Sequence, residues 1–253
     1  MGQLAGKHAL ITGGGTGIGA AIAKALSGEG AAVSLAGRRR EPLEQAAARL
    51  PKAAAIIADV TDPQSCAEMA AQARNAHGPI DIVVANAGAA ESAPAGKIKR
   101  EQWQRMIDVN LSGAFYTAQA ALADVTRNDA AGRIVFIAST AGLKGYPYVA
   151  AYCAAKHGVV GLMRALAAEF GGKGVTVNAV CPGYTDTPLL EASVANITTK
   201  TGRSAEQARA ALAKDNESGR LITPEEVAAK VLWLCSPAGV STNGEAILVT
   251  GAP

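Results

Sequence analysis

The sequence has few aromatic residues, few cysteines and no strong excess of charge of either sign. Aromatic residues make up 4% of the 253-residue chain, whereas 49% of it is hydrophobic. We therefore expect a core built from Ala, Val, Ile and Leu, which is typical of parallel α/β sheets whose strands are buried on both faces. The formal net charge is only +3, and the one basic run covers residues 38–40. This balance argues against a nucleic acid as the main ligand.

The four cysteines are scattered at Cys66, Cys153, Cys181 and Cys235, without the spacing of a metal site. We expect free thiols in a reducing compartment, the cytoplasm, rather than a disulfide framework. The three histidines show no ligand spacing either, so we expect no metal. No uninterrupted apolar run reaches the roughly 18 residues of a transmembrane helix, and the first residues lack a signal-peptide pattern. We expect a soluble protein with no membrane partner.

A short hydrophobic strand at 8–12 runs directly into a glycine-rich turn, and hydrophobic residues then recur at helical spacing. In this context Gly13 permits a tight turn, Gly17 leaves room for a pyrophosphate, and Gly19 lets the helix pack on the sheet. The amino terminus of the helix offers amide donors and the positive end of its dipole to phosphates. The order of strand, turn and helix therefore predicts a dinucleotide site.

Three arginines follow the next predicted strand, 32–36, and no Asp or Glu lies between Val33 and Arg40. An acidic residue at the end of this strand would bind the 2′-hydroxyl of NAD, whereas an arginine accommodates the 2′-phosphate of NADP. Arg38 is best placed for the phosphate, with Arg39 stacking on the adenine or pairing with the same phosphate. NADP(H) is therefore favoured. NAD(H) stays open, because solvated loop arginines would look the same in the sequence.

A strand-like run at 133–138 ends at Ser139, and a helical pattern follows in which Tyr152 and Lys156 lie four residues apart. This spacing puts both side chains on one face of a helix. A free phenol has a pKa of about 10, and we expect the lysine ammonium to lower it toward the working range. Ser139 could hydrogen-bond a substrate carbonyl or hydroxyl. These three residues predict a proton-transfer site.

Seven motifs in order resemble the short-chain dehydrogenase/reductase family, over nearly the whole chain. They are the glycine-rich run 12–19, the pairs at 59–60 and 182–183, the run 86–88, Asn110, Ser139, and Tyr152 with Lys156. Each is weak alone, but seven in the family's order are specific, and the glycine spacing GxxxGxG is the family's own. Two positions depart from the pattern. Ala85 replaces an asparagine, and Thr16 stands where NADP-binding members can have a basic residue.

The resemblance implies a fold and a set of site residues. The fold is a single Rossmann-type α/β domain over residues 1–253, doubly wound around a mostly parallel seven-stranded sheet with helices on both faces. A substrate lid is expected at about 187–222. Asn110, Ser139, Tyr152 and Lys156 would be catalytic, with Asn110 kinking its helix and completing a proton relay. The dinucleotide would be bound by Gly13, Thr16, Gly17, Ile18, Gly19, Arg38, Arg39, Asp59, Val60, Asn86, Ala87, Gly88, Tyr152, Lys156, Pro182, Gly183, Thr185 and Thr187.

The implied reaction is hydride transfer between a nicotinamide dinucleotide and a ketone, a 3-oxoacyl group or a secondary alcohol. The partner is then a small carbonyl compound, alcohol or acyl thioester. A second interpretation is an NAD-dependent 3-hydroxyacyl-CoA or secondary-alcohol dehydrogenase, and a third is a dinucleotide-binding sensor without chemistry. The family also implies a homotetramer, or a homodimer, assembled through the long helices that carry Asn110 and Tyr152. The sequence leaves the substrate and the physiological direction open.

Overall fold

The computed structural model describes residues 2–127 and 131–251. Seven strands form one sheet in the order β3-β2-β1-β4-β5-β6-β7, and all neighbouring strands pair in parallel. This doubly wound sheet was predicted, and it is parallel throughout rather than mostly parallel. The strands are β1 (His8–Thr12), β2 (Ala32–Gly37), β3 (Ala53–Ile57), β4 (Ile82–Ala85), β5 (Arg133–Ile137), β6 (Thr176–Pro182) and β7 (Ala246–Val249).

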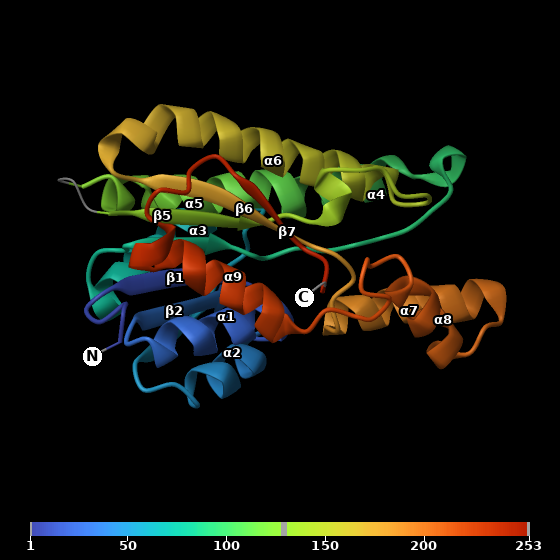
Figure 1. Ribbon diagram of the computed structural model, residues 1–253, viewed down its shortest axis with the longest axis horizontal. Helices are drawn as coiled ribbons and strands as arrows, with labels where there is room; N and C mark the ends of the chain where they lie inside the picture. The colour runs from blue at the N-terminus through green and yellow to red at the C-terminus, as the bar shows by residue number, and fades with distance from the viewer. Residues whose placement is uncertain (1, 128–130, 252–253) are drawn as a thin grey trace.

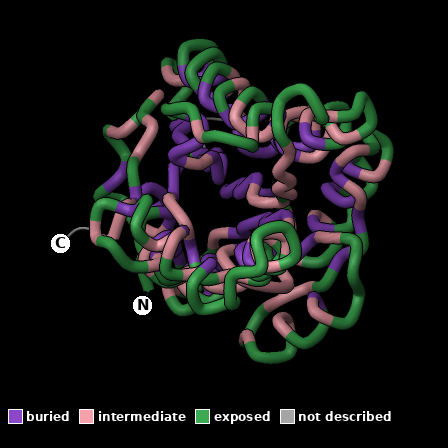
Figure 2. Tube along the Cα trace, turned by 90° about the vertical axis from the view of Figure 1, so that its right-hand side faces the viewer, coloured by how far each residue is buried: buried purple, intermediate pink, exposed green. Residues whose placement is uncertain are grey.

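Helices cover both faces of the sheet (Figure 1). One face carries α1 (Gly17–Gly28), α2 (Arg40–Ala47) and α9 (Pro224–Cys235), and the other carries α3 (Pro63–His77), α5 (Gly113–Val125) and α6 (Ala150–Phe170). Neighbouring residues of β5 bury their side chains on opposite faces, because Phe136 joins one core cluster and Val135 the other. Figure 2 shows buried residues inside and exposed residues on the outer turns of the helices. Within residues 2–127 and 131–251, no helix is both long and apolar enough to cross a membrane.

A pair of helices stands apart from the sheet, beyond the end of β6 (Figure 1). These are α7 (Pro188–Thr201) and α8 (Ala205–Ala213), which make up most of the segment 187–222. They pack on each other through a small cluster of their own, formed by Leu190, Val194, Ala208 and Leu212. Because parallel strands of this topology place their carboxyl ends at one edge, the helix pair lies over that edge.

The sequence pattern predicts one helix at 103–126, and the helical stretch in the structure is longer and is interrupted. It consists of α4 (Arg100–Ile107), a π-helical turn η2 (Asp108–Ser112) and α5. Single-turn π segments are local distortions of an α-helix, and this one lies where the kink at Asn110 was expected. The remaining short helices are η1 (Ala95–Lys97), η3 (Thr140–Gly142), η4 (Gly171–Lys173) and η5 (Pro237–Gly239).

Other boundaries differ by a few residues from those that the sequence pattern predicts. The pattern predicts strands at 54–58, 80–85 and 175–180, whereas β3 begins at Ala53, β4 begins at Ile82, and β6 runs on to Pro182, because β7 pairs with its last residues. It also predicts a helix at 41–50, which is α2 and ends at Ala47. The residue types at Asp62 and Thr223 predict helix caps, and both are confirmed: the Asp62 side chain accepts from the amide of Gln64, and Thr223 forms a capping box with Glu226.

Candidate active site

A cavity of about 830 Å³ lies where the strands end, between the sheet and α7. Its walls come from segments that are far apart in the chain, from the glycine turn to helices α7 and α8. It is lined by every predicted site residue except Gly19, namely Gly13, Thr16, Gly17, Ile18, Arg38, Arg39, Asp59, Val60, Asn86, Ala87, Gly88, Asn110, Ser139, Tyr152, Lys156, Pro182, Gly183, Thr185 and Thr187.

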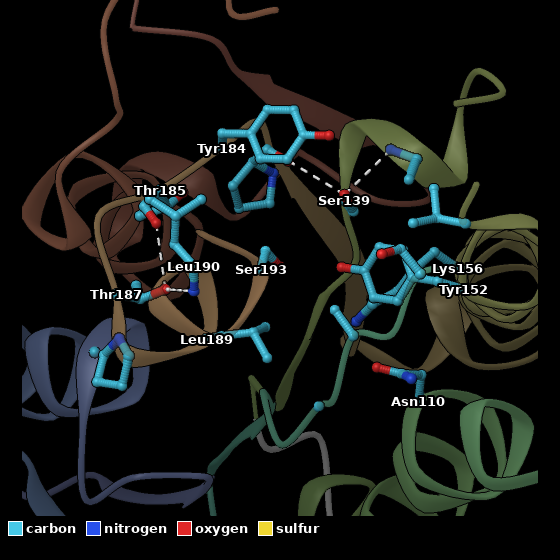
Figure 3. Close-up of a pocket in the computed structure, with 18 of the residues that line it drawn as sticks. Asn110, Ser139, Tyr152, Lys156, Tyr184, Thr185, Thr187, Leu189, Leu190 and Ser193 are labelled. Carbon is cyan, nitrogen blue, oxygen red and sulfur yellow. Dashed lines mark hydrogen bonds between the residues drawn. The ribbon is translucent and has the colours of Figure 1, made fainter. Parts of the chain in front are cut away.

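Ser139, Tyr152, Lys156 and Asn110 lie together on one side of this cavity (Figure 3). Ser139 is the second residue after β5, whereas Tyr152 and Lys156 come from the first turns of α6. The Lys156 Nζ lies 5.7 Å from the centre of the Tyr152 ring, so the two side chains share one face of the helix. The Ser139 hydroxyl accepts a hydrogen bond from the amide of Ala141 at 3.1 Å. A hydroxyl, a phenol and an ammonium thus face one space.

Burial sets the protonation of this group. Lys156 is only 4% exposed, and its Nζ donates to the carbonyl oxygen of Ile137 at 2.8 Å. Burial lowers the pKa of Lys156 to about 8 and raises the pKa of the Tyr152 phenol to about 12. The expected lowering of the phenol pKa is therefore wrong for the protein alone, because the lost hydration of a phenolate outweighs the hydrogen bond with the Ser139 hydroxyl that would stabilise it. At neutral pH the phenol holds its proton and can donate it.

Asn110 lies in the π-helical turn η2 and ties it to the loop after β4. Its side-chain amide donates to the carbonyl oxygens of Ala89 at 2.9 Å and Met106 at 3.0 Å. Its Oδ1 accepts from the Ala89 amide at 3.2 Å. Gly88 leaves room for this contact, since a Cβ there would lie 3.0 Å from the Asn110 Oδ1. The π-helical turn therefore places Asn110 against the cavity.

The glycine turn at the start of α1 fits a phosphate group. Gly13 and Gly17 have φ angles of +66° and +53°, in the left-handed region that favours glycine. No side chain of the described residues caps α1, because Thr16 stands at its N-cap position without a side-chain hydrogen bond. The first backbone donors of α1 are therefore free for an anion.

Gly19 is the one predicted cofactor residue that does not line the cavity. A Cβ at Gly19 would lie 2.2 Å from the carbonyl oxygen of Gly13 and 2.7 Å from the Nδ2 of Asn86. The close approach is thus to the glycine turn itself and to the end of β4, rather than to the middle of the sheet. Gly19 lets the turn close, and it shapes the cavity from behind.

Asn86 joins the ends of β1 and β4 below the glycine turn. Its Nδ2 donates to the carbonyl oxygens of Thr12 at 2.8 Å and Gly13 at 3.2 Å. In return the Thr12 hydroxyl accepts from the backbone amides of Asn86 and Ala87 at 3.1 and 3.2 Å. These four bonds hold the two central strands and the turn in one rigid unit at the edge of the cavity.

Arg38 and Arg39 stand exposed at the end of β2, at the corner of the cavity that also holds Asp59. Among the described residues neither arginine forms an ion pair, whereas Arg40 beside them pairs with Glu44. Asp59 accepts from the amide and hydroxyl of Thr61 at 3.0 and 2.8 Å. These bonds, helped by the positive charge of Arg38, hold the pKa of Asp59 below its usual value. Two cations and one anion therefore line this corner.

Thr185 and Thr187 lie across the cavity from Ser139 and Tyr152, where the chain enters α7 (Figure 3). The Thr187 hydroxyl donates to the carbonyl oxygen of Thr185 at 3.2 Å and accepts from the amide of Leu190 at 3.3 Å. It thus serves as the N-cap of α7. A Cβ at Gly17 would lie 3.2 Å from Thr187, so α7 begins directly against the glycine turn.

No individual role was predicted for the residues that face Ser139 and Tyr152 across the cavity, although most of them lie in the segment 187–222 that was expected to cover the substrate. Tyr184, Leu189, Leu190 and Ser193 come from the end of β6 and from α7 (Figure 3). Tyr146 also lines the cavity and packs edge-on against Tyr184, with ring centres 6.1 Å apart. One signal was present: three of the five tyrosines of an aromatic-poor chain fall within 146–152.

Known proteins share this combination of fold and cavity. The model of the family described as short chain dehydrogenase matches residues 7–198. A D-beta-hydroxybutyrate dehydrogenase of Cupriavidus necator is 37% identical over 249 residues, covering 96% of this chain and 95% of its own. A putative ketoacyl reductase of Streptomyces coelicolor is 35% identical over 249 residues, with the same coverage. A crystal structure of an actinorhodin polyketide ketoreductase with NADPH superposes with a TM-score of 0.93 at 33% identity, covering 99% of this chain and 98% of that one.

Proposed function

Because the chain belongs to the short-chain dehydrogenase family and is an oxidoreductase that interconverts a ketone and a secondary alcohol, we propose that Tyr152 moves the proton at the reacting oxygen. The observation that carries this proposal is the meeting of Tyr152, Lys156 and Ser139 in the same cavity as the glycine turn. A phenol that is protonated at neutral pH and lies beside a hydroxyl and an ammonium is suited to general acid–base catalysis at a substrate oxygen.

A nicotinamide dinucleotide, when bound, supplies or accepts the hydride. The residues present fit its diphosphate, since the glycine turn carries no side chains at Gly13 and Gly17 and the first donors of α1 are free. They also fit a 2′-phosphate, because Arg38 and Arg39 line the corner without ion-pair partners among the described residues. We therefore propose a preference for NADP(H) over NAD(H). The structural relative named with NADPH supports this choice.

In the reducing direction, the Tyr152 phenol gives its proton to the substrate oxygen as negative charge develops there. The Ser139 hydroxyl donates a hydrogen bond to the same oxygen and stabilises that charge. The phenolate left behind is stabilised by the Lys156 ammonium one turn away. Asn110 belongs to the path by which a proton returns from solvent. In the oxidising direction the same groups act in reverse, and the phenolate takes the alcohol proton.

The substrate is proposed to be a small ketone, a 3-oxoacyl group or the matching secondary alcohol. Relatives of this chain are named for beta-hydroxybutyrate and for ketoacyl groups, and both names describe a keto or hydroxyl oxygen on an acyl chain. The segment 187–222 would act as the lid of the substrate half of the cavity, which Leu189, Leu190 and Ser193 line from α7.

Two further properties complete the proposal. The enzyme would work in the reducing cytoplasm, which is supported by its four free cysteines. It would assemble as a homotetramer, or as a homodimer, through the helices that carry Asn110 and Tyr152. Small exposed residues such as Ala150 and Ala154 on α6 leave room for close helix contact, and sedimentation of the purified protein measures the assembly.

Titration of NADPH and of NADH by fluorescence tests the cofactor preference. Arg38→Ala should weaken NADPH binding by about tenfold or more, since a charge-assisted contact is lost, while leaving NADH binding unchanged. Arg40→Ala is the matched control, because Arg40 is exposed nearby but does not line the cavity. The proposed 2′-phosphate contact would be contradicted if NADH bound at least as tightly as NADPH and if Arg38→Ala changed neither affinity. The protein would then be an NAD-dependent secondary-alcohol or hydroxyacyl-CoA dehydrogenase.

A further inference from the structure

The segment 187–222 leaves and rejoins the protein through a narrow neck. Thr185 and Ile222 form an isolated parallel bridge at this point. The amide of Ile222 donates to the carbonyl oxygen of Tyr184 at 2.9 Å, and the amide of Asp186 donates to the carbonyl oxygen of Ile222 at 2.9 Å. Because Gly183, Tyr184 and Thr185 also line the cavity, whatever fixes the neck also fixes that wall.

Asn216 is buried in this neck, with 6% of its surface exposed, and it uses all of its main hydrogen-bonding groups. Its Nδ2 donates to the carbonyl oxygens of Tyr184 at 2.9 Å and Arg220 at 2.7 Å. Its Oδ1 accepts from the amide of Tyr184 at 2.9 Å. One side chain thereby bonds both the amide and the carbonyl group of Tyr184, where the segment leaves the protein, and the carbonyl group of Arg220, where it returns.

Gly183 is shaped to receive this side chain. A Cβ at Gly183 would lie 2.2 Å from the Oδ1 of Asn216, closer than real atoms approach. The neighbouring carbonyl oxygen of Pro182 lies 3.5 Å from the Ser139 hydroxyl, which donates toward it. A continuous series of contacts thus joins the proposed catalytic serine, Ser139, through Pro182 and Gly183 to Asn216.

We propose that Asn216 is a positioning residue for the reaction, which holds Gly183 and Tyr184 as the cavity wall that faces Ser139 and Tyr152. This inference rests on the proposed function of the cavity. Only an asparagine meets the geometry: an aspartate lacks the two donors, and an apolar residue leaves the buried amide of Tyr184 without an acceptor. The same side chain pins the base of the lid helices, so the wall and the lid move together.

Asn216→Asp tests this role against a matched variant, Asn178→Asp. Asn178 is also buried, with 1% exposed, and it also bridges backbone groups, because its Nδ2 donates to Thr242 at 2.8 Å and its Oδ1 accepts from Glu245 at 3.0 Å. It lies on β6 but does not line the cavity. The two variants should therefore show a similar decrease in the temperature of unfolding, and only Asn216→Asp should disturb the cavity.

Two measurements compare these variants, namely the KM for a ketone substrate and the rate at which trypsin cleaves the segment 187–222. With NADPH and ethyl acetoacetate, a small 3-oxo ester, Asn216→Asp should raise the KM for the ester about tenfold with a smaller change in kcat, since misplacement of the wall weakens binding. Trypsin should also cleave the lid faster at Lys200, Arg203 or Lys214, because the neck no longer restrains it. Asn178→Asp should change neither KM nor the cleavage rate of the lid.

Equal KM values and equal cleavage of the lid in the two variants would overturn the proposal and leave Asn216 a purely structural residue. Cleavage needs no turnover, so it decides the matter even if the wild-type protein does not reduce the ester, an outcome that would count against the proposed function instead. Should Asn216→Asp not fold, Gly183→Ala replaces it, because the added methyl group would displace the Asn216 side chain while residue 216 remains an asparagine.

Discussion

Lys156 lies one helical turn beyond Tyr152, with its Nζ 5.7 Å from the centre of the tyrosine ring. At the wall of the cavity Lys156 is buried and Tyr152 is partly buried. Burial favours the neutral form of each group: the pKa of the phenol rises to about 12 and the pKa of the amine falls to about 8. At neutral pH the pair therefore holds one positive charge and one phenol proton. This state is suited to giving a proton to a carbonyl oxygen.

The pH dependence of reduction follows from that pair. Reduction should stay level from neutral pH and fall as the pH rises through about 8, where Lys156 loses the charge that stabilises the phenolate. Oxidation, which needs the phenolate, should rise with pH over the same range. Initial rates with NADPH in the forward direction, and with NADP in reverse, measure both limbs. Lys156→Arg keeps its charge at high pH, so the fall near pH 8 should vanish in that variant; a wild-type profile that is flat through this region contradicts the assignment.

Gly19→Ala should damage both stability and dinucleotide binding. The new methyl group would lie 2.2 Å from the carbonyl oxygen of Gly13, and relieving that overlap should cost on the order of 3 kcal/mol and distort the turn. Gly28→Ala, at the other end of α1, meets nothing within 4 Å and should change stability by no more than about 1 kcal/mol, in the stabilising direction. Urea unfolding and NADPH titration of both variants test this contrast. Equal behaviour of the two would show that the turn tolerates a side chain.

The sequence was informative wherever a local pattern carried the structure. The glycine turn, the positions of all seven strands and the face shared by Tyr152 and Lys156 depend on neighbours in the chain, so periodicity and spacing reveal them. The caps at Asp62 and Thr223 belong to the same class. The resemblance to a known family then indicated which of the distant motifs would meet.

The rest depends on contacts that no local pattern shows. Asn216 looks like a surface residue of a polar segment, and only the folded neck shows that it bonds Tyr184 on both sides. The pKa of Tyr152 was predicted in the wrong direction, because spacing gives the nearness of a charge but not the loss of water around the phenol. The close neighbours of Gly19, Gly13 and Asn86, were likewise beyond the reach of a local pattern, because Asn86 is far from Gly19 in the sequence.

Stability should fall at acid pH because of His8, at the far end of β1 from the cavity. His8 is buried, with Nδ1 2.9 Å from the carbonyl oxygen of Gly78 and Nε2 2.9 Å from the Ser34 hydroxyl. Burial lowers its pKa below 6.5 in the folded state, so the unfolded chain binds more protons as the pH drops through about 6.5. The free energy of unfolding should therefore be level above that pH and decrease below it.

The measurement is urea unfolding at neutral pH and at about pH 5, where an ordinary histidine is charged. His8→Gln should lower stability at neutral pH but lose less of it on acidification, since one source of proton uptake is removed. The exposed His157→Gln is the control and should follow the wild type at both pH values. If His8→Gln lost as much stability on acidification as the wild type does, His8 would have no part in the acid sensitivity.

The most direct measurement of the central claim is turnover and dinucleotide binding of Tyr152→Phe, followed together on one preparation. The variant keeps the ring that lines the cavity and loses only the hydroxyl that would move the proton. The account predicts that NADPH binds with unchanged affinity while the rate of ketone reduction falls by about a factor of 100 to 10,000, the usual contribution of a general acid. A variant that reduces ketones at the wild-type rate would contradict it, and the proton donor would have to be sought elsewhere in the cavity.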